Sequence, residues 1–133
     1  MAETFVMRGR VIKAGRAEGP ALVSPAPISF LGGVDPDSGV VLEAGHPLKG
    51  RSVAGTMLVF PTGKGSTVGS YTILRLARNG RGPVAIINAE SEAIVAVGAI
   101  IADIPMVDQI DIALIQDGDR VTVEDGVVTV QRM

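Results

Sequence analysis

The order of patterns in the middle of the chain constrains the fold most: an apolar run, a glycine-containing turn and a helical pattern are followed by a second apolar run and a second helical pattern. Residues 53–60 form an apolar run closed by Pro61, which predicts a buried strand. Asn79-Gly80 predicts a helix end, and Ser91 predicts the cap of a second helix. The predicted elements are strand 53–60, helix 68–77, strand 84–88, helix 91–101 and strand 104–107. Alternation of strands and helices predicts an α/β domain.

The two ends of the chain predict strands and turns. The strongest signal is Asp125-Gly126, a hairpin turn between the runs 120–124 and 127–132. Extended patterns also occur at 5–13, 21–24, 40–43 and, as a short strand or turn, 112–115. Because no linker, repeat or low-complexity tract interrupts the chain, we expect residues 1–133 to form one domain with mixed, partly barrel-like strands.

Composition limits the classes of function. Of the 133 residues, 12 are Lys or Arg and 14 are Asp or Glu, which argues against nucleic acid or an anionic membrane as the main partner. The absence of cysteine excludes disulfides, thiol nucleophiles and cysteine-held iron–sulfur clusters in this chain. The longest uncharged apolar run, 93–102, is shorter than the roughly 20 residues of a membrane span, and the N-terminus lacks a secretory signal. We therefore expect a soluble, cytoplasmic protein.

Residues 60–71, FPTGKGSTVGSY, form the segment best suited to chemistry. Here a buried strand ends, a glycine loop turns and a helix begins; glycines let the backbone approach a ligand, and the first amides of a helix favour an anion. Lys64 adds a positive charge, so a carboxylate or phosphate fits the loop. The alternative is equally open: Ser66 or Thr67 is only a helix N-cap, and the glycines serve only the turn. The order Lys64-Gly65 does not match a nucleotide-binding P-loop.

Simpler explanations are available for the other polar positions. Gly32-Gly33 before Asp35 predicts a tight surface turn, with the border of a site as the alternative. His46, the single histidine, lies in a loop where we expect it to be solvated, and it argues against a catalytic triad or a histidine-rich metal site. Solvent-facing positions or helix caps are expected for Arg75, Arg78, Arg81, Glu90, Glu92, Asp103 and Asp108.

Five segments of the chain contain specific sequence motifs. They are FLGGVDPDSG (30–39), SVAG (52–55), FPTGKGSTVGSY (60–71), PVAIIN (83–88) and AIVAVGAIIADIPMVD (93–108). Together these motifs resemble the small subunit of the aconitase X family, and the resemblance covers nearly the whole chain. The likeness is greater to the archaeal-type branch of this family. The resemblance implies the swivelling β/β/α domain of aconitases, with about two main helices and barrel-like strands, detached as its own chain.

The resemblance also implies a hydro-lyase that needs a second chain. The archaeal-type branch dehydrates mevalonate 5-phosphate to trans-anhydromevalonate 5-phosphate on the way to isoprenoids, and the large subunit of the heterodimer carries a 4Fe–4S cluster. In the family a serine of the small subunit is the catalytic base, and Ser66 is the matching position. A serine alkoxide is poorly populated at neutral pH, so Ser66 would need the positive potential of helix amides and of Lys64. We expect this chain alone to be inactive.

The glycine loops are expected to meet both the anionic substrate and the large subunit. We expect the partner interface to include residues 28–39 and 60–71, and no metal to be held by this chain. Two alternatives stay open: a sister branch of the family dehydrates cis-3-hydroxy-L-proline, and a non-catalytic swivel module of the phosphocarrier type would need a histidine where this loop has Ser66. The expected substrate-binding residues are Gly63, Lys64, Gly65, Thr67, Gly32 and Gly33.

Overall fold

The computed structural model describes residues 3–132, so that the expected domain limits at 1 and 133 lie outside the described residues. Two helices, α1 (Gly69–Arg78) and α2 (Ala93–Ala102), accompany ten strands and a short 3₁₀ turn, η1 (Ile112–Leu114). The strands are β1 (Glu3–Arg8), β2 (Arg10–Lys13), β3 (Arg16–Val23), β4 (Ile28–Ser29), β5 (Met57–Phe60), β6 (Gly63–Lys64), β7 (Ala85–Asn88), β8 (Met106–Asp108), β9 (Arg120–Glu124) and β10 (Val127–Arg132).

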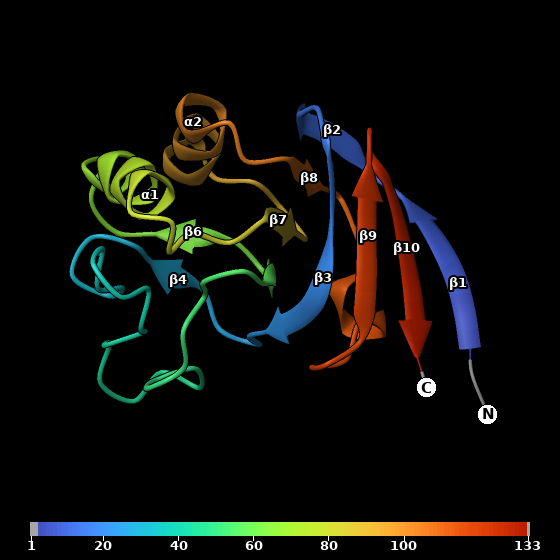
Figure 1. The fold of residues 1–133 in the computed structure, drawn as a ribbon, viewed down its shortest axis with the longest axis horizontal. Helices are drawn as coiled ribbons and strands as arrows, with labels where there is room; N and C mark the ends of the chain where they lie inside the picture. Colours follow the sequence, from blue (N-terminus) through green and yellow to red (C-terminus); the bar gives the residue numbers. More distant parts are fainter. Residues whose placement is uncertain (1–2, 133) are drawn as a thin grey trace.

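Eight of these strands form one curled sheet in the order β1-β10-β9-β3-β5-β7-β8-β2. The neighbours β3–β5, β5–β7 and β7–β8 are parallel, and the other pairs of this sheet are antiparallel. Strands β1 and β2 follow each other in the chain yet lie at opposite ends of the strand order, which requires the sheet to curl round on itself. In Figure 1, α1 and α2 lie together on one side of the molecule, and β9, β10 and β1 form the other side.

Two apolar cores lie on the two faces of this sheet. One fills the space between the sheet, the helices and the segment 28–53, and it includes Phe30 and Phe60, whose rings meet edge to face. The other lies inside the curl and is built mainly from valine and isoleucine. Strands β5 and β7 are buried at every residue because they are covered on both faces, which is why β5 and the first three residues of β7 read as apolar runs.

The structure confirms the α/β class, the two helices and the mixed, barrel-like strands. The hairpin prediction is also confirmed, since β9 and β10 pair antiparallel and Glu124 lies opposite Val127. Asp125 and Gly126 both have positive φ, as a tight hairpin turn of the primed type requires.

Several boundaries differ from the prediction. The strand expected at 5–13 is broken at Gly9, where a Cβ atom would collide with the backbone oxygen of Asp108. The strand expected at 53–60 begins only at Met57, because residues before it turn. Of residues 40–43, only Val40 and Val41 form isolated bridges. Residues 112–114 form a 3₁₀ turn, which agrees with the second of the two alternatives, a short strand or a turn.

Three side-chain predictions are wrong. His46 is buried rather than solvated: its Nδ1 accepts the N–H of Leu48, so its Nε2 donates to the carbonyl of Pro27, at 3.0 Å each. The cap of α2 is Glu92, whose carboxylate accepts the N–H of Ile94, and not Ser91. Asp108 is completely buried rather than solvent-facing.

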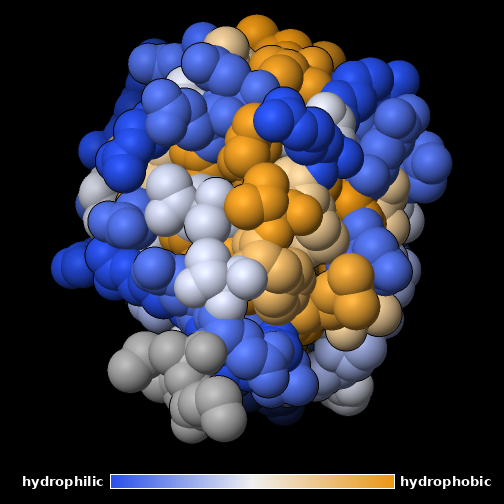
Figure 2. All heavy atoms as spheres, turned by 90° about the vertical axis from the view of Figure 1, so that its right-hand side faces the viewer, coloured by the Kyte–Doolittle hydropathy of each residue, from blue (hydrophilic) through white to orange (hydrophobic). Residues whose placement is uncertain are grey.

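Exposed apolar side chains occur on more than one face. Figure 2 looks onto the side that carries β1 and shows apolar residues gathered among charged ones. On the outer surface of β1, Val6 is 57 % exposed. Within residues 3–132, neither helix is long and apolar enough to cross a membrane.

Candidate active site

The loop after β5 is held against the segment 28–39. Strand β6, in the middle of this loop, pairs in parallel with β4, so that Gly63 lies opposite Ile28 and Lys64 opposite Ser29. The base of the loop is fixed by β7, since the N–H groups of the two residues after Asn88 both donate to the carbonyl of Pro61. The structure therefore brings together the two segments that the sequence analysis singled out separately.

Ser66 lies on the surface at the entrance to α1. Its Oγ accepts a hydrogen bond from the N–H of Val68 at 3.2 Å, and its carbonyl accepts the N–H of Gly69 at 2.9 Å. The residue at the N-cap position is Val68, so neither Ser66 nor Thr67 is the N-cap. The hydroxyl is thus accessible and is polarised by one backbone amide.

Several backbone amides at the start of α1 already donate hydrogen bonds, although the sequence analysis expected them to be free for an anion. The N–H of Gly69 and that of Tyr71 both donate within the turn, to the carbonyls of Ser66 and Val68. The amide of Val68 is the one that donates to the Ser66 hydroxyl. The positive end of the helix therefore acts on Ser66 through this single bond together with the helix dipole.

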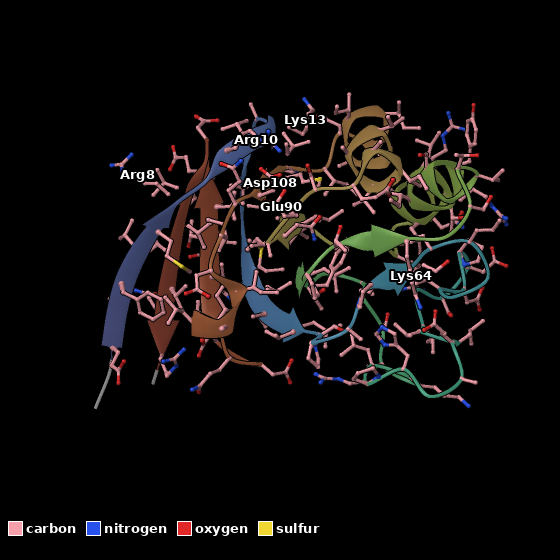
Figure 3. All side chains as sticks on the ribbon, turned by 180° about the vertical axis from the view of Figure 1, so that it is seen from behind. Arg8, Arg10, Lys13, Lys64, Glu90 and Asp108 are labelled. Carbon is pink, nitrogen blue, oxygen red and sulfur yellow. The ribbon has the colours of Figure 1, made fainter. Side chains whose placement is uncertain are left out.

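Lys64 is engaged with a carboxylate that sequence reasoning did not associate with it. Its Nζ lies 3.3 Å from Oε2 of Glu43, and both side chains are partly exposed. Figure 3 shows Lys64 on β6, well apart from the charged group of Arg10, Glu90 and Asp108. The ammonium is near the loop, but a substrate anion would have to compete with Glu43 for it.

Glycine is required at two positions of the loop. At Gly65, φ is +97°, and a Cβ atom would collide with the hydroxyl of Ser29. At Gly63, a Cβ atom would collide with the side chain of Val95. Ser29, which no local sequence signal marks, is therefore a neighbour of the loop.

Gly32 and Gly33 lie in the turn that follows β4. Gly33 is buried, and a Cβ atom there would collide with the carbonyl of Ser29, whereas Gly32 is exposed with open space around it. Thr67 is exposed directly after Ser66. All six residues expected to bind substrate thus lie on the two segments joined by β4 and β6.

An apolar hollow of about 460 Å³ adjoins the loop between α1 and α2. Its lining includes Thr67 and Val68 from the loop, Tyr71 from α1, and Val97 and Ile101 from α2. Tyr71 is 64 % exposed, and about half of each of the side chains of Val68, Val97 and Ile101 is exposed. An exposed apolar surface of this kind is typical of a place where another chain docks.

A buried carboxylate, Asp108, pairs with the partly exposed Arg10 on the other side of the α2 start. Burial disfavours the ionised carboxylate of Asp108, but hydrogen bonds from Arg10 and Ser91 outweigh this effect and hold its pKa below the ordinary value. The hydrogen bond to Asp108 raises the pKa of the Arg10 guanidinium. Sequence reasoning missed this pair because its members are 98 residues apart.

The sequence has no cysteine, and no group of three or more His, Asp or Glu residues is placed to hold a metal ion within the part of the chain that the structure describes. An iron–sulfur cluster does not fit these residues.

A curled sheet of mixed strands, with two helices on one face and an exposed Gly-Lys-Gly-Ser loop leading into the first of them, defines a swivel-type β/β/α domain. The family model described as "Aconitase X swivel domain" matches residues 6–131. The chain belongs to this family.

Similar proteins agree with this assignment. The phosphomevalonate dehydratase small subunit of Methanocella arvoryzae is 59% identical over 89% of this chain and 92% of its own length. The protein of the same name from Thermococcus onnurineus is 54% identical over 94% of this chain and 98% of its own length. A chain in the crystal structure of Thermococcus kodakaraensis aconitase X (holo-form) superposes with a TM-score of 0.92, with 52% identity over 94% of this chain and 97% of that chain.

Proposed function

We propose that this chain is the small subunit of a phosphomevalonate dehydratase, a hydro-lyase that converts mevalonate 5-phosphate to trans-anhydromevalonate 5-phosphate. Support comes from relatives of that name, which match about nine-tenths of the chain. The observation that carries the proposal is the accessible hydroxyl of Ser66, polarised by the Val68 amide on a loop at the entrance to α1.

In the proposed reaction Ser66 accepts the proton. The alkoxide takes a proton from the carbon next to the carboxylate, the C–H electrons form the C=C bond, and the hydroxyl leaves the neighbouring carbon, so that water is lost in total. The N–H of Val68 stabilises the alkoxide more than the hydroxyl, because a hydrogen bond to a charged acceptor is stronger.

The large subunit would complete the site. A 4Fe–4S cluster held there would supply Lewis-acid assistance to the leaving hydroxyl, and its thiolate ligands must belong to that subunit because this chain has no cysteine. On this side of the interface, substrate oxygens would meet Lys64, Thr67 and the backbone around Gly32-Gly33 and Gly63 to Gly65. This chain would then be inactive without its partner.

We infer that the large subunit covers residues 28–39 and 60–71 together with the hollow between α1 and α2. The two segments lie side by side through β4 and β6, and the hollow begins at Thr67, next to Ser66. A partner seated there would exclude water from the Ser66 hydroxyl while placing its own groups opposite it. The single domain over residues 1–133 and the cytoplasmic location remain predictions from the sequence.

Replacing Ser66 by alanine tests the proton acceptor. In the complex co-expressed with its large subunit, we expect Ser66→Ala to lower kcat for mevalonate 5-phosphate by about 100-fold or more. Thr4→Ala, which removes an exposed hydroxyl from β1, is the matched control and should leave kcat unchanged. Full turnover by Ser66→Ala would contradict the proposed base.

The same complex distinguishes the alternatives. Turnover of cis-3-hydroxy-L-proline in place of mevalonate 5-phosphate would assign the sister activity. The phosphocarrier alternative has less support, because both ring nitrogens of His46 are occupied by hydrogen bonds in the interior. Phosphate on His46 after incubation with a phosphodonor would revive it.

A further inference from the structure

The end of β8 holds a fully buried carboxylate. The side chain of Asp108 accepts hydrogen bonds from Nε of Arg10 at 3.0 Å, from Nη2 of Arg10 at 2.6 Å and from the N–H of Ser91 at 3.0 Å. Arg10 begins β2 and Asp108 ends β8 (Figure 3). Ser91 lies just before α2. This one carboxylate therefore ties two strands to the start of a helix.

This tie is one of the contacts that hold the entrance to α2. Ser91 directly precedes Glu92, whose carboxylate caps the helix through the N–H of Ile94 at 3.0 Å. Because the N–H of Ser91 is bound to Asp108, the chain enters α2 from a fixed point.

The same turn of α2 contacts the Ser66 loop at both of its ends. Before Ser66, the side chain of Val95 lies so close to Gly63 that no Cβ atom fits there. After Ser66, the hydroxyl of Ser70 donates to the carbonyl of Ile94 at 2.7 Å. The loop that carries Ser66 is therefore supported on both sides by the helix turn that Asp108 holds.

We propose that Arg10 and Asp108 are positioning residues for Ser66, acting through the first turn of α2. This inference rests on the proposed function, since it takes Ser66 as the reacting group. When the pair is broken, the helix turn loses its fixed point, and Gly63 and Ser70 lose their support. A misplacement of about 1 Å at a reacting group can cost about 100-fold in rate, so the expected effect is large although neither residue touches substrate.

A second buried carboxylate, Asp119, pairs with Arg132 in the same sheet and provides a matched control. Asp119 is 6% exposed and accepts from Nε and Nη2 of Arg132, at 3.1 and 2.7 Å, and from the N–H of Gln116 at 2.8 Å. The chemistry is the same, but this pair ties β10 to the turn before β9 rather than to α2.

The test compares the two pairs in the complex with the large subunit. At a temperature below all unfolding transitions, Asp108→Asn should lower kcat about 10- to 100-fold with KM changed less than about threefold, whereas Asp119→Asn should keep kcat within about twofold. Both variants should lower the unfolding temperature. Equal losses of kcat in the two variants, or no loss in Asp108→Asn, would overturn the inference.

A second measurement does not depend on the reaction. In amide hydrogen exchange, Asp108→Asn and the milder Arg10→Lys should both speed exchange in residues 63–70 of the complex, and Asp119→Asn should not. If the wild-type complex fails to dehydrate mevalonate 5-phosphate, the proposed function fails, while exchange still decides whether the pair holds the loop. Unchanged exchange in both variants would reject the positioning role.

Discussion

Gly65 is a position where any side chain meets two obstacles. Its φ of +97° is unfavourable for other residues, and a Cβ atom would also collide with the hydroxyl of Ser29. Gly118 shares only the first obstacle, since its φ is +87° and nothing lies within 4 Å of its Cβ position. A comparison of substitutions at the two glycines therefore distinguishes the effect of backbone strain from the effect of a clash within the candidate site.

We therefore expect Gly65→Ala to lower kcat of the complex by about tenfold or more, because the clash displaces the residue directly before Ser66. Gly118→Ala should cost only about 1 to 2 kcal/mol of stability from strain and leave kcat unchanged. Steady-state kinetics and thermal unfolding of both variants provide the check. If Gly65→Ala behaves like Gly118→Ala in both measurements, the packing of Ser29 against the loop does not matter for activity.

Prediction from the sequence succeeded for single residues where the signal was local. The Gly-Lys-Gly-Ser word marked an exposed loop between a buried strand and a helix, and the structure has this arrangement. It failed for His46 and Asp108, whose burial depends on partners such as Pro27 and Arg10 that are distant in sequence. Nothing near Lys64 in the chain indicates its pairing with Glu43.

At the scale of elements, α2 stands out because it carries no charged residue from Ala93 to Ala102. One side packs on the core through Val95 and Ala99, while Val97 and Ile101 remain about half exposed. A helix that is apolar all round is normally buried, so its outer side needs a cover. The hollow next to the Ser66 loop is where we place the large subunit.

Val97→Glu tests this cover. The side chain is 48% exposed, so the substitution should disturb folding of this chain little while weakening binding of the large subunit by about tenfold or more. Val6→Glu on β1, where the side chain is 57% exposed, is the matched control and should bind normally. Size-exclusion chromatography of co-expressed pairs and titration calorimetry measure both. If Val97→Glu assembles normally with the large subunit, the exposed side of α2 is not part of the interface.

The elements themselves were predicted where one segment contains the whole signal. The 120–132 hairpin and the α1 stop at Asn79-Gly80 agree with the sequence patterns. The strand expected at 53–60 was too long, because its first half turns to pack against other segments: the N–H of Val53 donates to the carbonyl of Gly39. Such tertiary contacts leave no periodic trace in the segment itself.

At the scale of the molecule, the two end strands of the sheet are held by long-range pairings. Strand β1 pairs with β10, where Glu3 lies opposite Arg132, and β2 pairs with β8, where Arg10 lies opposite Asp108, so each edge joins segments far apart in the chain. The sequence predicted barrel-like strands but not their order, because the apolar patterns of these strands are interchangeable. The two buried carboxylates, Asp108 and Asp119, lie among these long-range contacts and couple the stability of the whole sheet to pH.

The direction of this coupling follows from the native pKa values. For Asp108, burial opposes ionisation but the bonds from Arg10 and Ser91 prevail; for Asp119, the bond from Arg132 is the largest influence; both pKa values lie below the ordinary 3.8. The unfolded chain therefore binds protons first as the pH falls. The stabilisation by each carboxylate is complete above about pH 5 and is lost progressively below about pH 4, as the pH falls through the native pKa.

Thermal unfolding of this chain between pH 7 and pH 2.5 should thus show a nearly constant transition temperature down to about pH 5 and a fall below about pH 4. Asp108→Asn and Asp119→Asn should each lower the transition at pH 7 and flatten its fall in acid, because the titrating group is gone. Glu124→Gln, in the exposed pair with Arg16 at 3.7 Å, should change little, since surface pairs contribute little. An acid slope that stays the same in both Asn variants would mean that other carboxylates set the acid stability, and that Asp108 and Asp119 are not the groups through which pH acts on the sheet.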